Sequence, residues 1–459
     1  MGGKRVWFVH PDLGIGGAEM LVVNAAVALE NLGYQVEIFT AHHDEAHCFA
    51  ETKSDGRLAG KVKVYGDWIP RTLFGRFHVV CAMLRMIWVS LVITYKSIVQ
   101  GDKPDVVFCD QVSHLVPLLT RGTGAPVVFY CHFPDKLLCV DRGSFLKRLY
   151  RLPIDWWEEA STGAADTVVV NSKFTASVFR ESFSSLVHVP LGVLYPAIEL
   201  AQFDRKLNNT ETKLANDGMP TGYLEHIKKF GKDAVIFLSI NRFERKKNLL
   251  LAIEAMNKLK TDSTLLSNKE FERTHLIMAG GYDNRLEENV RYMQELVDLV
   301  STYKLERKVS FLKSFTNDQR LVLIKMARCV IYTPDNEHFG IVPIEAMYCG
   351  VPVLAVASGG PLESVSHEQS GFLEKQEPAK FAARMATLAQ DQALAKKMGT
   401  QGTKMVREKF SLSAFGADLE KIIRDSLEVH KERGGGGTLL LPLLVFSCLV
   451  VLLSGYLIR

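Results

Sequence analysis

The sequence predicts an α/β protein with two doubly wound domains, and three observations support this fold class. At 459 residues the chain is too long for one ordinary core, because domains usually hold roughly 100 to 200 residues. Short apolar runs alternate with helical patterns in both halves of the chain, which is typical of parallel sheets covered by helices. A polar segment separates the two sets of runs, which indicates a domain boundary.

The predicted strands fall into two series. The first comprises Arg5–His10, Gln35–Thr40, Asp105–Cys109, Pro126–Tyr130 and Asp166–Val170, with a helical pattern such as Ala18–Leu32 between strands. The second comprises Ala234–Ile240, His275–Ala279, Lys308–Leu312, Cys329–Tyr332 and Pro352–Val356, with a helical stretch at Asn284–Thr302. We therefore expect an N-terminal domain over 1–198, a linker over 199–232 and a C-terminal domain over 233–430. Because open α/β sheets bind ligands beyond the carboxyl ends of their strands, the site is expected in a crevice between two facing domains.

Two further apolar segments fit neither sheet. Residues 77–100 have a longest uncharged run of ten residues, from Met86 to Tyr95, which is too short to span a bilayer. Four basic residues surround this run, namely Arg71, Arg76, Arg85 and Lys96. This pattern suits a helix on a lipid surface, and an ordinary buried helix is the alternative. The uncharged residues 438–458 would form a membrane-spanning helix of about 31 Å at ~1.5 Å per residue, with a buried core helix as the alternative.

The net charge, the cysteines and the basic residues indicate the cellular compartment of the two predicted domains, which together form the body of the protein. A formal net charge of +4 is too small to indicate nucleic acid as a partner. The eight cysteines show no C-x-x-C pair, so reduced and mostly buried thiols are expected. The N-terminus lacks the apolar region of a signal peptide, and Lys431 and Arg433 precede the terminal span. Because positive residues favour the cytosolic side, we expect a cytosolic body with a tail anchor.

Two turns after predicted strands contain residues suited to phosphate. Gly14, Gly16 and Gly17 connect the first strand to a helix, where glycine lets the backbone approach a phosphate at the helix N-terminus. A structural turn is the alternative, and the departure from G-x-G-x-x-G disfavours a dinucleotide oxidoreductase. Arg242 and the lysines up to Lys247 follow the strand Ala234–Ile240. They could neutralise a leaving diphosphate, although such charge runs are usually solvated faces.

The strongest candidate site follows the strand Cys329–Tyr332. Gly340 and Pro343 predict a helix start there. Glu337 then lies in the preceding loop and Glu345 in the first turns of the helix, so both carboxylates can reach one mouth. One is suited to sugar hydroxyls and the other to ribose. A glycosidase pair is the alternative, but one loop and helix do not place two carboxylates across a glycosidic bond.

His132 follows the strand Pro126–Tyr130, on the side of the expected crevice, although a lone histidine is more often structural than catalytic. The chain has no D-x-D pair and no cluster of His and carboxylate ligands, so no metal is predicted. Arg242, Lys247 and helix dipoles must then neutralise a diphosphate.

These motifs resemble a known family. Glu337 and Glu345, with seven residues between them, are similar to the signature of the retaining GT-B glycosyltransferases, and the likeness covers nearly the whole chain before the tail. Four segments look more specifically like the endoplasmic-reticulum mannosyltransferases of dolichol-linked oligosaccharide assembly. They are residues 10–12 with 16–19, residues 130–135, residues 145–150 and residues 336–347.

The resemblance implies an enzyme of N-glycan precursor assembly on the cytosolic face of the endoplasmic reticulum membrane. It implies GDP-mannose as donor and mannosyl-chitobiosyl-diphosphodolichol as acceptor, extended by an α1,3-mannose and then an α1,6-mannose with retention. Membrane lipid and other mannosyltransferases of the pathway are the further partners it suggests. No cofactor or metal is implied beyond the GDP-mannose co-substrate.

The resemblance also assigns residues to the site. They are Gly16, Gly17, His132, Arg242, Lys247, Glu337, Phe339, Gly340, Ile341 and Glu345. By this assignment the glycines approach donor phosphate, Arg242 and Lys247 hold the diphosphate, and His132 lies at the mannose. Glu337 binds the mannose, Glu345 binds the ribose, and no residue acts as a covalent nucleophile.

Two other classes of protein share this fold. A catalytically silent nucleotide-sugar-binding scaffold at the membrane is the main alternative, and an epimerase or hydrolase is the second. The basic and acidic site residues are all present, which argues against a silent protein. An epimerase or hydrolase would need neither the lipid-facing segment nor the tail helix.

Overall fold

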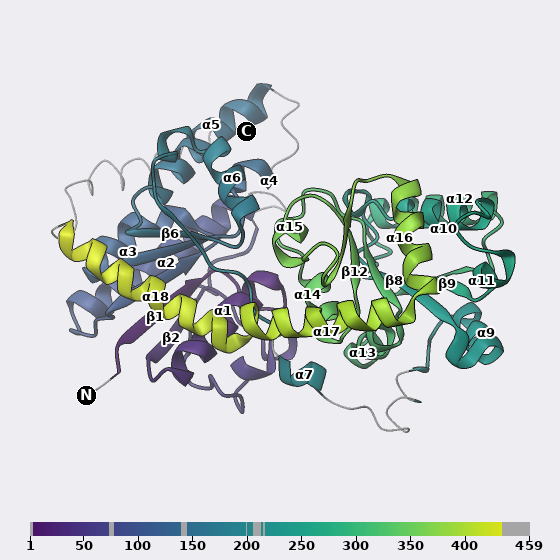
Figure 1. The fold of residues 1–459 in the computed structure, drawn as a ribbon. Helices are drawn as coiled ribbons and strands as arrows, with labels where there is room; N and C mark the ends of the chain where they lie inside the picture. Colours follow the sequence, from purple (N-terminus) through teal and green to yellow (C-terminus); the bar gives the residue numbers. More distant parts are fainter. Residues whose placement is uncertain are drawn as a thin grey trace. The chain divides into compact units, whose positions relative to one another are not determined.

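In the computed structural model, the chain divides into two compact units (Figure 1). The structure describes residues 3–72, 78–138, 145–198, 200–204, 213 and 216–433. Unit 1 comprises the chain up to Ala197 together with the chain from Leu412, and unit 2 comprises Ile198–Ser411. The predicted tail helix over 438–458 lies outside the described residues.

Unit 1 is built on a seven-stranded parallel sheet in the order β3-β2-β1-β4-β5-β6-β7. Its strands are β1 (Arg5–His10), β2 (Gln35–Thr40), β3 (Val62–Val64), β4 (Val106–Asp110), β5 (Val127–Cys131), β6 (Thr167–Val170) and β7 (Leu191–Val193). Alternate side chains of β1 enter two different cores: Phe8 packs in one, and Trp7 and Val9 pack in the other. Both faces of the sheet are therefore buried, as expected for a parallel sheet with crossover helices.

The helices of unit 1 cover this sheet. They are α1 (Gly17–Asn31), α2 (His78–Ile98), α3 (Val116–Thr123), α4 (Asp135–Leu138), α5 (Phe145–Thr162), α6 (Lys173–Ser182) and α18 (Leu412–Glu432). On α18, Phe415, Leu419 and Ile423 form a stripe at i, i+4 and i+8 that is buried in the same core as α1. Burial of each such side chain contributes about 1.5 to 3 kcal/mol, which explains why the last described helix returns to unit 1.

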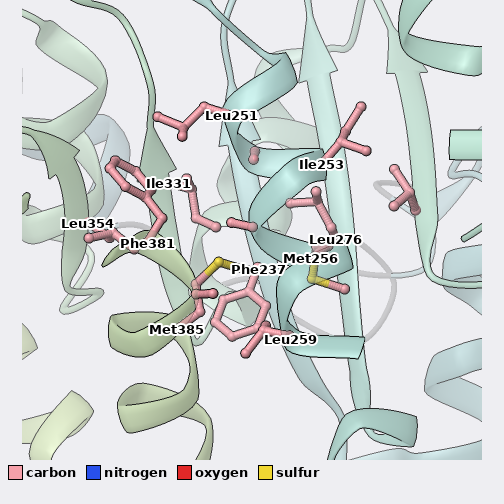
Figure 2. Packing of buried hydrophobic residues seen from close by; sticks show 14 of the residues in the cluster. Phe237, Leu251, Ile253, Met256, Leu259, Leu276, Ile331, Leu354, Phe381 and Met385 are labelled. Atoms are coloured by element: carbon pink, nitrogen blue, oxygen red, sulfur yellow. The ribbon is translucent and has the colours of Figure 1, made fainter. Parts of the chain in front are cut away.

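Unit 2 contains a six-stranded parallel sheet in the order β10-β9-β8-β11-β12-β13. The strands are β8 (Val235–Ile240), β9 (Thr274–Gly280), β10 (Val309–Lys313), β11 (Cys329–Tyr332), β12 (Val353–Val356) and β13 (Gly371–Glu374). Its helices are α7 (Leu200–Asp204), α9 (Thr221–Phe230), α10 (Leu250–Thr261), α11 (Asn268–Glu272), α12 (Glu287–Thr302), α13 (Asn317–Met326), α14 (Ile341–Tyr348), α15 (Pro361–Ser364), α16 (Pro378–Gln390) and α17 (Gln392–Lys409). Figure 2 shows Phe237 and Ile331 of the sheet packed against Met256 of α10 and Met385 of α16.

The predicted fold class is confirmed, because both sheets are parallel and helix-covered. Every predicted strand is present, with bounds that agree to within one residue. The predicted domain limits differ from the observed units at two places. The expected linker over 199–232 contains α9, whose Tyr223 and His226 are buried in unit 2, with Tyr223 Oη 2.9 Å from Met326 Sδ. The expected second domain over 233–430 ends early, because α18 belongs to unit 1.

The apolar segment 77–100 contains α2, and its environment can be compared with the two expectations, a helix on a lipid surface or an ordinary buried helix. One side, including Met86, Val89 and Ile93, is buried against the sheet, whereas Leu91 and Tyr95 are exposed on the other. Among the described residues, Val80–Ile98 is the one helix long and apolar enough to cross a membrane. The helix is thus a covering helix of unit 1 that also presents an apolar outer side.

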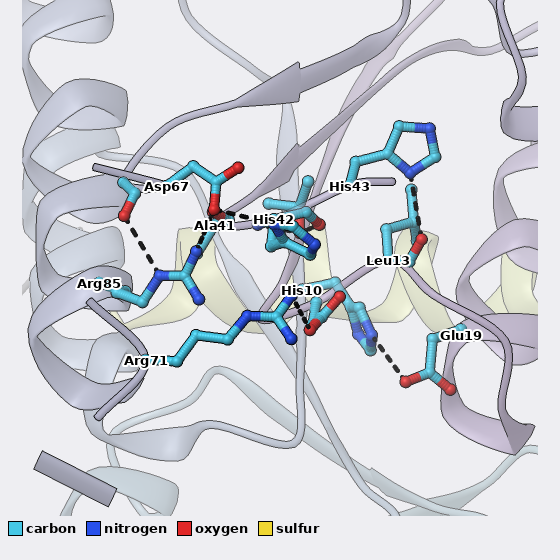
Figure 3. Close-up of polar contacts among 12 residues, drawn as sticks. His10, Leu13, Glu19, Ala41, His42, His43, Asp67, Arg71 and Arg85 are labelled. Carbon is cyan, nitrogen blue, oxygen red and sulfur yellow. Dashed lines mark hydrogen bonds and ion pairs between the residues drawn. The ribbon is translucent and has the colours of Figure 1, made fainter. Parts of the chain in front are cut away.

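The expectation that Arg85 and Lys96 flank a lipid-facing surface is wrong. Arg85 is buried and donates to the backbone oxygens of Gly66 (3.2 Å) and Ala41 (3.0 Å) and to Asp67 (2.6 Å). Figure 3 shows Arg85 beside Ala41 and Asp67. The Lys96 ammonium is 3.0 Å from Asp102 and lies near the ring of Trp7. The period of the helix turns both cations inward, where each has a carboxylate partner.

The cysteines agree with the expectation of reduced, buried thiols. Cys48, Cys81, Cys109, Cys131 and Cys329 are free and buried, and Cys349 is free and half-buried. The remaining two cysteines lie outside the described residues.

Candidate active site

The glycine turn of unit 1 leads from β1 into α1. Gly16 is the residue before the helix, and a Cβ there would collide with the carboxylate of Glu19. Gly17 begins the helix, and a Cβ there would meet no atom within 4 Å. Gly16 has no side chain to cap α1, but the Glu19 carboxylate lies against Gly16 and accepts a hydrogen bond from its own backbone N–H. An anion at this helix N-terminus would therefore meet the N–H groups of Gly17 and Ala18 beside that carboxylate.

A buried polar network lies at the carboxyl ends of β1, β4 and β5. His10 Nδ1 is 2.7 Å from Asp110 Oδ1, and His132 Nε2 is 3.0 Å from Asp110 Oδ2. Glu19 lies on the other side of His10, with 3.8 Å between its Oε1 and His10 Nε2 (Figure 3). His10 and Asp110 are fully buried, whereas His132 is partly exposed. The structure therefore connects the predicted His132 to Asp110, which the sequence analysis did not single out. It also connects His132 through Asp110 to His10 and Glu19, which lie in a segment that carries the family resemblance but had no assigned role.

The pKa shifts in this network favour the charged forms of His10 and Asp110. Burial alone would lower the pKa of His10, but the carboxylates of Asp110 and Glu19 raise it to about 10. Burial would raise the pKa of Asp110, but His10 and His132 hold it below its usual value. An imidazolium thus lies between two carboxylates inside unit 1.

The basic cluster after β8 in unit 2 divides between different partners. Arg242 and Lys246 both contact Glu244, at 2.9 Å and 3.2 Å, and Arg245 pairs with Glu295. Lys247 points elsewhere and forms an ion pair with Glu337. Lys247 is also anchored through its backbone oxygen, which accepts from Thr333 Oγ1 at 2.7 Å.

The loop that carries Glu337 is held by a second glycine turn. The backbone oxygen of Glu337 accepts from Gly360 N at 2.7 Å, and Asn336 N donates to Ser358 Oγ at 3.0 Å. A Cβ at Gly359 would collide with the Glu337 backbone, and one at Gly360 with Phe339. Sequence reasoning missed this turn, although Gly359 and Gly360 closely follow a strand, as a phosphate-binding or close-contact turn often does.

The predicted helix after the loop is confirmed as α14. Gly340 precedes it with φ 82, and Ile341 is its first residue. Phe339 is buried 5.7 Å from the ring of Phe410, so it supports the loop from within. Glu345 lies inside α14, as expected, and is buried.

Glu345 forms an ion pair with Arg320 of α13, a partner that the sequence did not indicate. Burial raises the pKa of Glu345 to about 7, and Arg320 opposes that shift. Burial raises the pKa of the Tyr332 hydroxyl, and the nearby carboxylates of Glu337 and Glu345 raise it further. Lys247, Glu337, Tyr332, Glu345 and Arg320 therefore form one cluster at the carboxyl end of β11. Within the described residues, no group of three His, Cys, Asp or Glu side chains is arranged to hold a metal ion.

Comparisons with known proteins define the class. The family model "Glycosyl transferases group 1" matches residues 224–405, and "Glycosyltransferase Family 4" matches residues 15–202. The fold is similar to sucrose-phosphate synthase from Thermosynechococcus elongatus, with a TM-score of 0.65 and 18% identity over 92% of this chain and 98% of that one. It is also similar to the catalytic domain of starch synthase IV from Arabidopsis thaliana, with a TM-score of 0.65 and 15% identity over 93% and 100%. The chain is a glycosyltransferase with two Rossmann-like domains.

Curated relatives narrow this class. Alpha-1,3/1,6-mannosyltransferase ALG2 of Homo sapiens is 46% identical over 421 residues, which cover 91% of this chain and 95% of that protein. The proteins of the same name from Rhizomucor pusillus and Dictyostelium discoideum are 42% and 43% identical, over 97% and 92% of this chain and 98% of each relative. The chain belongs to the ALG2 family of alpha-1,3/1,6-mannosyltransferases. The predicted enzyme class is thereby confirmed.

Proposed function

We propose that the enzyme transfers mannose from GDP-mannose to mannosyl-chitobiosyl-diphosphodolichol, adding an α1,3-linked and then an α1,6-linked mannose with retention. The two linkages in the names of the relatives support this reaction. The observation that carries the proposal is the Lys247–Glu337 ion pair beside the Arg320–Glu345 pair, because it combines a cation for phosphate with carboxylates for sugar hydroxyls.

Each charged group has a distinct task in this reaction. Lys247 and Arg242 neutralise the leaving diphosphate, and the first turn of α1 offers N–H groups at Gly17 to a phosphate. Glu337 accepts hydrogen bonds from mannose hydroxyls. Glu345 accepts hydrogen bonds from the ribose hydroxyls in its ionised form, which Arg320 favours against the effect of burial.

Retention follows from attack on the face that the diphosphate leaves. The bond between mannose C1 and the phosphate oxygen breaks, and a bond from C1 to the acceptor oxygen forms on the same face. The acceptor hydroxyl passes its proton to the departing phosphate. His132 contacts the mannose, and no side chain forms a covalent intermediate. Positioning and charge stabilisation then supply the rate enhancement.

We propose that the body works on the cytosolic side of the endoplasmic reticulum membrane. The outer side of α2 exposes Trp88, Leu91 and Tyr95, and the exposed Trp68 packs edge-on against Trp88 at 5.4 Å. Aromatic and aliphatic side chains of this kind suit the interface of a bilayer, where a dolichol-linked acceptor resides. Other mannosyltransferases of the pathway are the proposed protein partners.

Donor competition tests the proposed substrate. Purified enzyme with a synthetic lipid-linked acceptor should incorporate sugar from GDP-mannose and should not do so from UDP-glucose. Omission of the acceptor should leave GDP-mannose largely intact. Transfer from UDP-glucose would contradict the donor assignment, and release of free mannose alone would identify a hydrolase.

A further inference from the structure

The buried His10 and Asp110 are unexplained by the roles assigned so far, since neither is exposed to a substrate. Both side chains have no solvent exposure, and they connect the core of unit 1 to His132. Burying a charged pair is costly unless it has good hydrogen bonds, so such a network needs a reason.

The hydrogen bonds at Asp110 determine which ring nitrogens carry protons. Asp110 has a lowered pKa because His10 and His132 outweigh the effect of burial, and an ionised carboxylate only accepts hydrogen bonds. Its two oxygens are 2.7 Å from His10 Nδ1 and 3.0 Å from His132 Nε2. Both nitrogens must therefore be donors.

The charge of Asp110 is balanced from the buried side. His10 donates Nδ1–H to Asp110, and its Nε2 has no hydrogen-bond partner among the described residues but lies 3.8 Å from Glu19. With its raised pKa, His10 is the cation between the two carboxylates. Asp110 thus has its counter-ion in the core, and His132 is left to face outward.

The ring of His132 is held on several sides. Tyr130 packs against it at 4.7 Å in an edge-on arrangement, and its own hydroxyl donates to Leu194 O at 3.0 Å. Asn171 Nδ2 donates to the His132 backbone oxygen at 3.1 Å. Within the part of the chain that the structure describes, His132 Nδ1 has no hydrogen-bond partner, and the side chain is 25% exposed.

We propose that His10 and Asp110 are positioning residues that lock His132 as the Nε2–H tautomer, so that Nδ1 accepts a hydrogen bond from a sugar hydroxyl. This inference rests on the proposed function, in which His132 contacts mannose. It deepens that function by specifying the recognised atom as a hydroxyl hydrogen. A phosphate oxygen has no hydrogen to give and would need a donor at this position.

The tautomer can be measured directly in the wild-type full-length enzyme without substrate. Histidine-selective ¹⁵N labelling distinguishes protonated from bare ring nitrogens, and the His132 signals are assigned by their loss in His132→Gln. We expect a bare Nδ1 on His132 and two protonated nitrogens on His10. A proton on His132 Nδ1, whether Nε2 is bare or protonated, would overturn the proposal, whether or not the proposed reaction is correct.

Asp110→Asn tests the consequence for activity. An asparagine can accept from His10 through its oxygen and donate to His132 through its amide, which moves the His132 proton to Nδ1. We expect kcat to fall at least tenfold, with GDP affinity unchanged. Weaker binding of GDP-mannose would assign the hydroxyl to the donor sugar, whereas a raised KM for acceptor alone would assign it to the acceptor.

Asp166→Asn is the matched control. Asp166 also has a buried side chain in unit 1 and pairs with His430 at 2.9 Å. It directly precedes β6, so it lies at the amino ends of the parallel strands, whereas Asp110 lies at their carboxyl ends. The variant should keep activity within about twofold. Equal losses in the two variants would reduce Asp110 to a structural role. If Asp110→Asn fails to fold, His10→Asn, which retains a donor to Asp110, should remain more active than His10→Leu, and equal activity of those two would overturn the role of His10.

Discussion

Replacing Lys247 with alanine removes the ammonium that contacts Glu337. The side chains of this pair are only 13% and 23% exposed, so the charges act in a partly dehydrated environment. Two unit charges about 4 Å apart attract by roughly 4 kcal/mol at an effective dielectric constant of about 20. Loss of one pre-organised hydrogen-bond donor at a transition state typically costs about 2.7 to 4 kcal/mol. We therefore expect kcat to fall roughly a hundredfold or more.

The neighbouring Lys246 provides the control, because it is 67% exposed and contacts Glu244 instead. The assay is the initial rate of radiolabelled mannose transfer at saturating GDP-mannose, with circular dichroism to check folding. Lys246→Ala should keep the rate within about twofold. The double variant with Glu337→Ala should lose less than the product of the single losses, because either change already breaks the pair. Near-native turnover of Lys247→Ala, or an equal loss in Lys246→Ala, would refute the reasoning.

Three further predictions concern pH, metal and topology. The pKa of Glu345 is raised to about 7 by burial, so kcat/KM for GDP-mannose should fall as the pH drops through 7. Arg320→Met should shift this decrease to higher pH, and an unchanged pH profile would show that Arg320 does not act on the donor site. EDTA should leave activity largely intact, whereas loss restored by manganese or magnesium would reveal a metal requirement. Asn208-Asn209-Thr210 is an N-glycosylation sequon, so a body on the luminal side would expose Asn208 to glycosylation. In microsomes, added protease should digest the body without detergent and Asn208 should carry no glycan; a protected, glycosylated body would contradict the cytosolic topology.

The strands were predictable because a strand buried on both faces of a parallel sheet is a continuous apolar run. Three of the four edge strands were not predicted, because they are short: β3 and β7 hold three residues each and β13 holds four. The five-residue edge strand β10 was predicted. The return of α18 to unit 1 was not predictable, since its stripe of Phe415, Leu419 and Ile423 indicates an amphipathic helix but not its partner. The apolar content of α2 was clear, whereas the inward direction of Arg85 depends on its contacts with Gly66 and Asp67.

In the candidate site, too, residues in local motifs were predicted, whereas contacts between distant parts of the sequence were not. Glu337 and Glu345 were found because the loop-to-helix transition is local, and Gly340 marks it. The network around His132 was missed because His10 and Asp110 are separated by 100 residues in sequence. A local signal did exist, since polar residues end the buried strands β1 and β4. Arg320 had no such signal, because its pairing with Glu345 joins two helices and is not local in sequence.

Product linkage analysis tests the central claim most directly. Purified enzyme is incubated with GDP-mannose and synthetic mannosyl-chitobiosyl-diphospholipid, and the products are examined by linkage-specific mannosidases and mass spectrometry at successive times. We expect one added mannose in α1,3 linkage, followed by a second in α1,6 linkage. A β-linked product would contradict retention, and a single linkage type or unchanged acceptor would contradict the proposed two-step transfer.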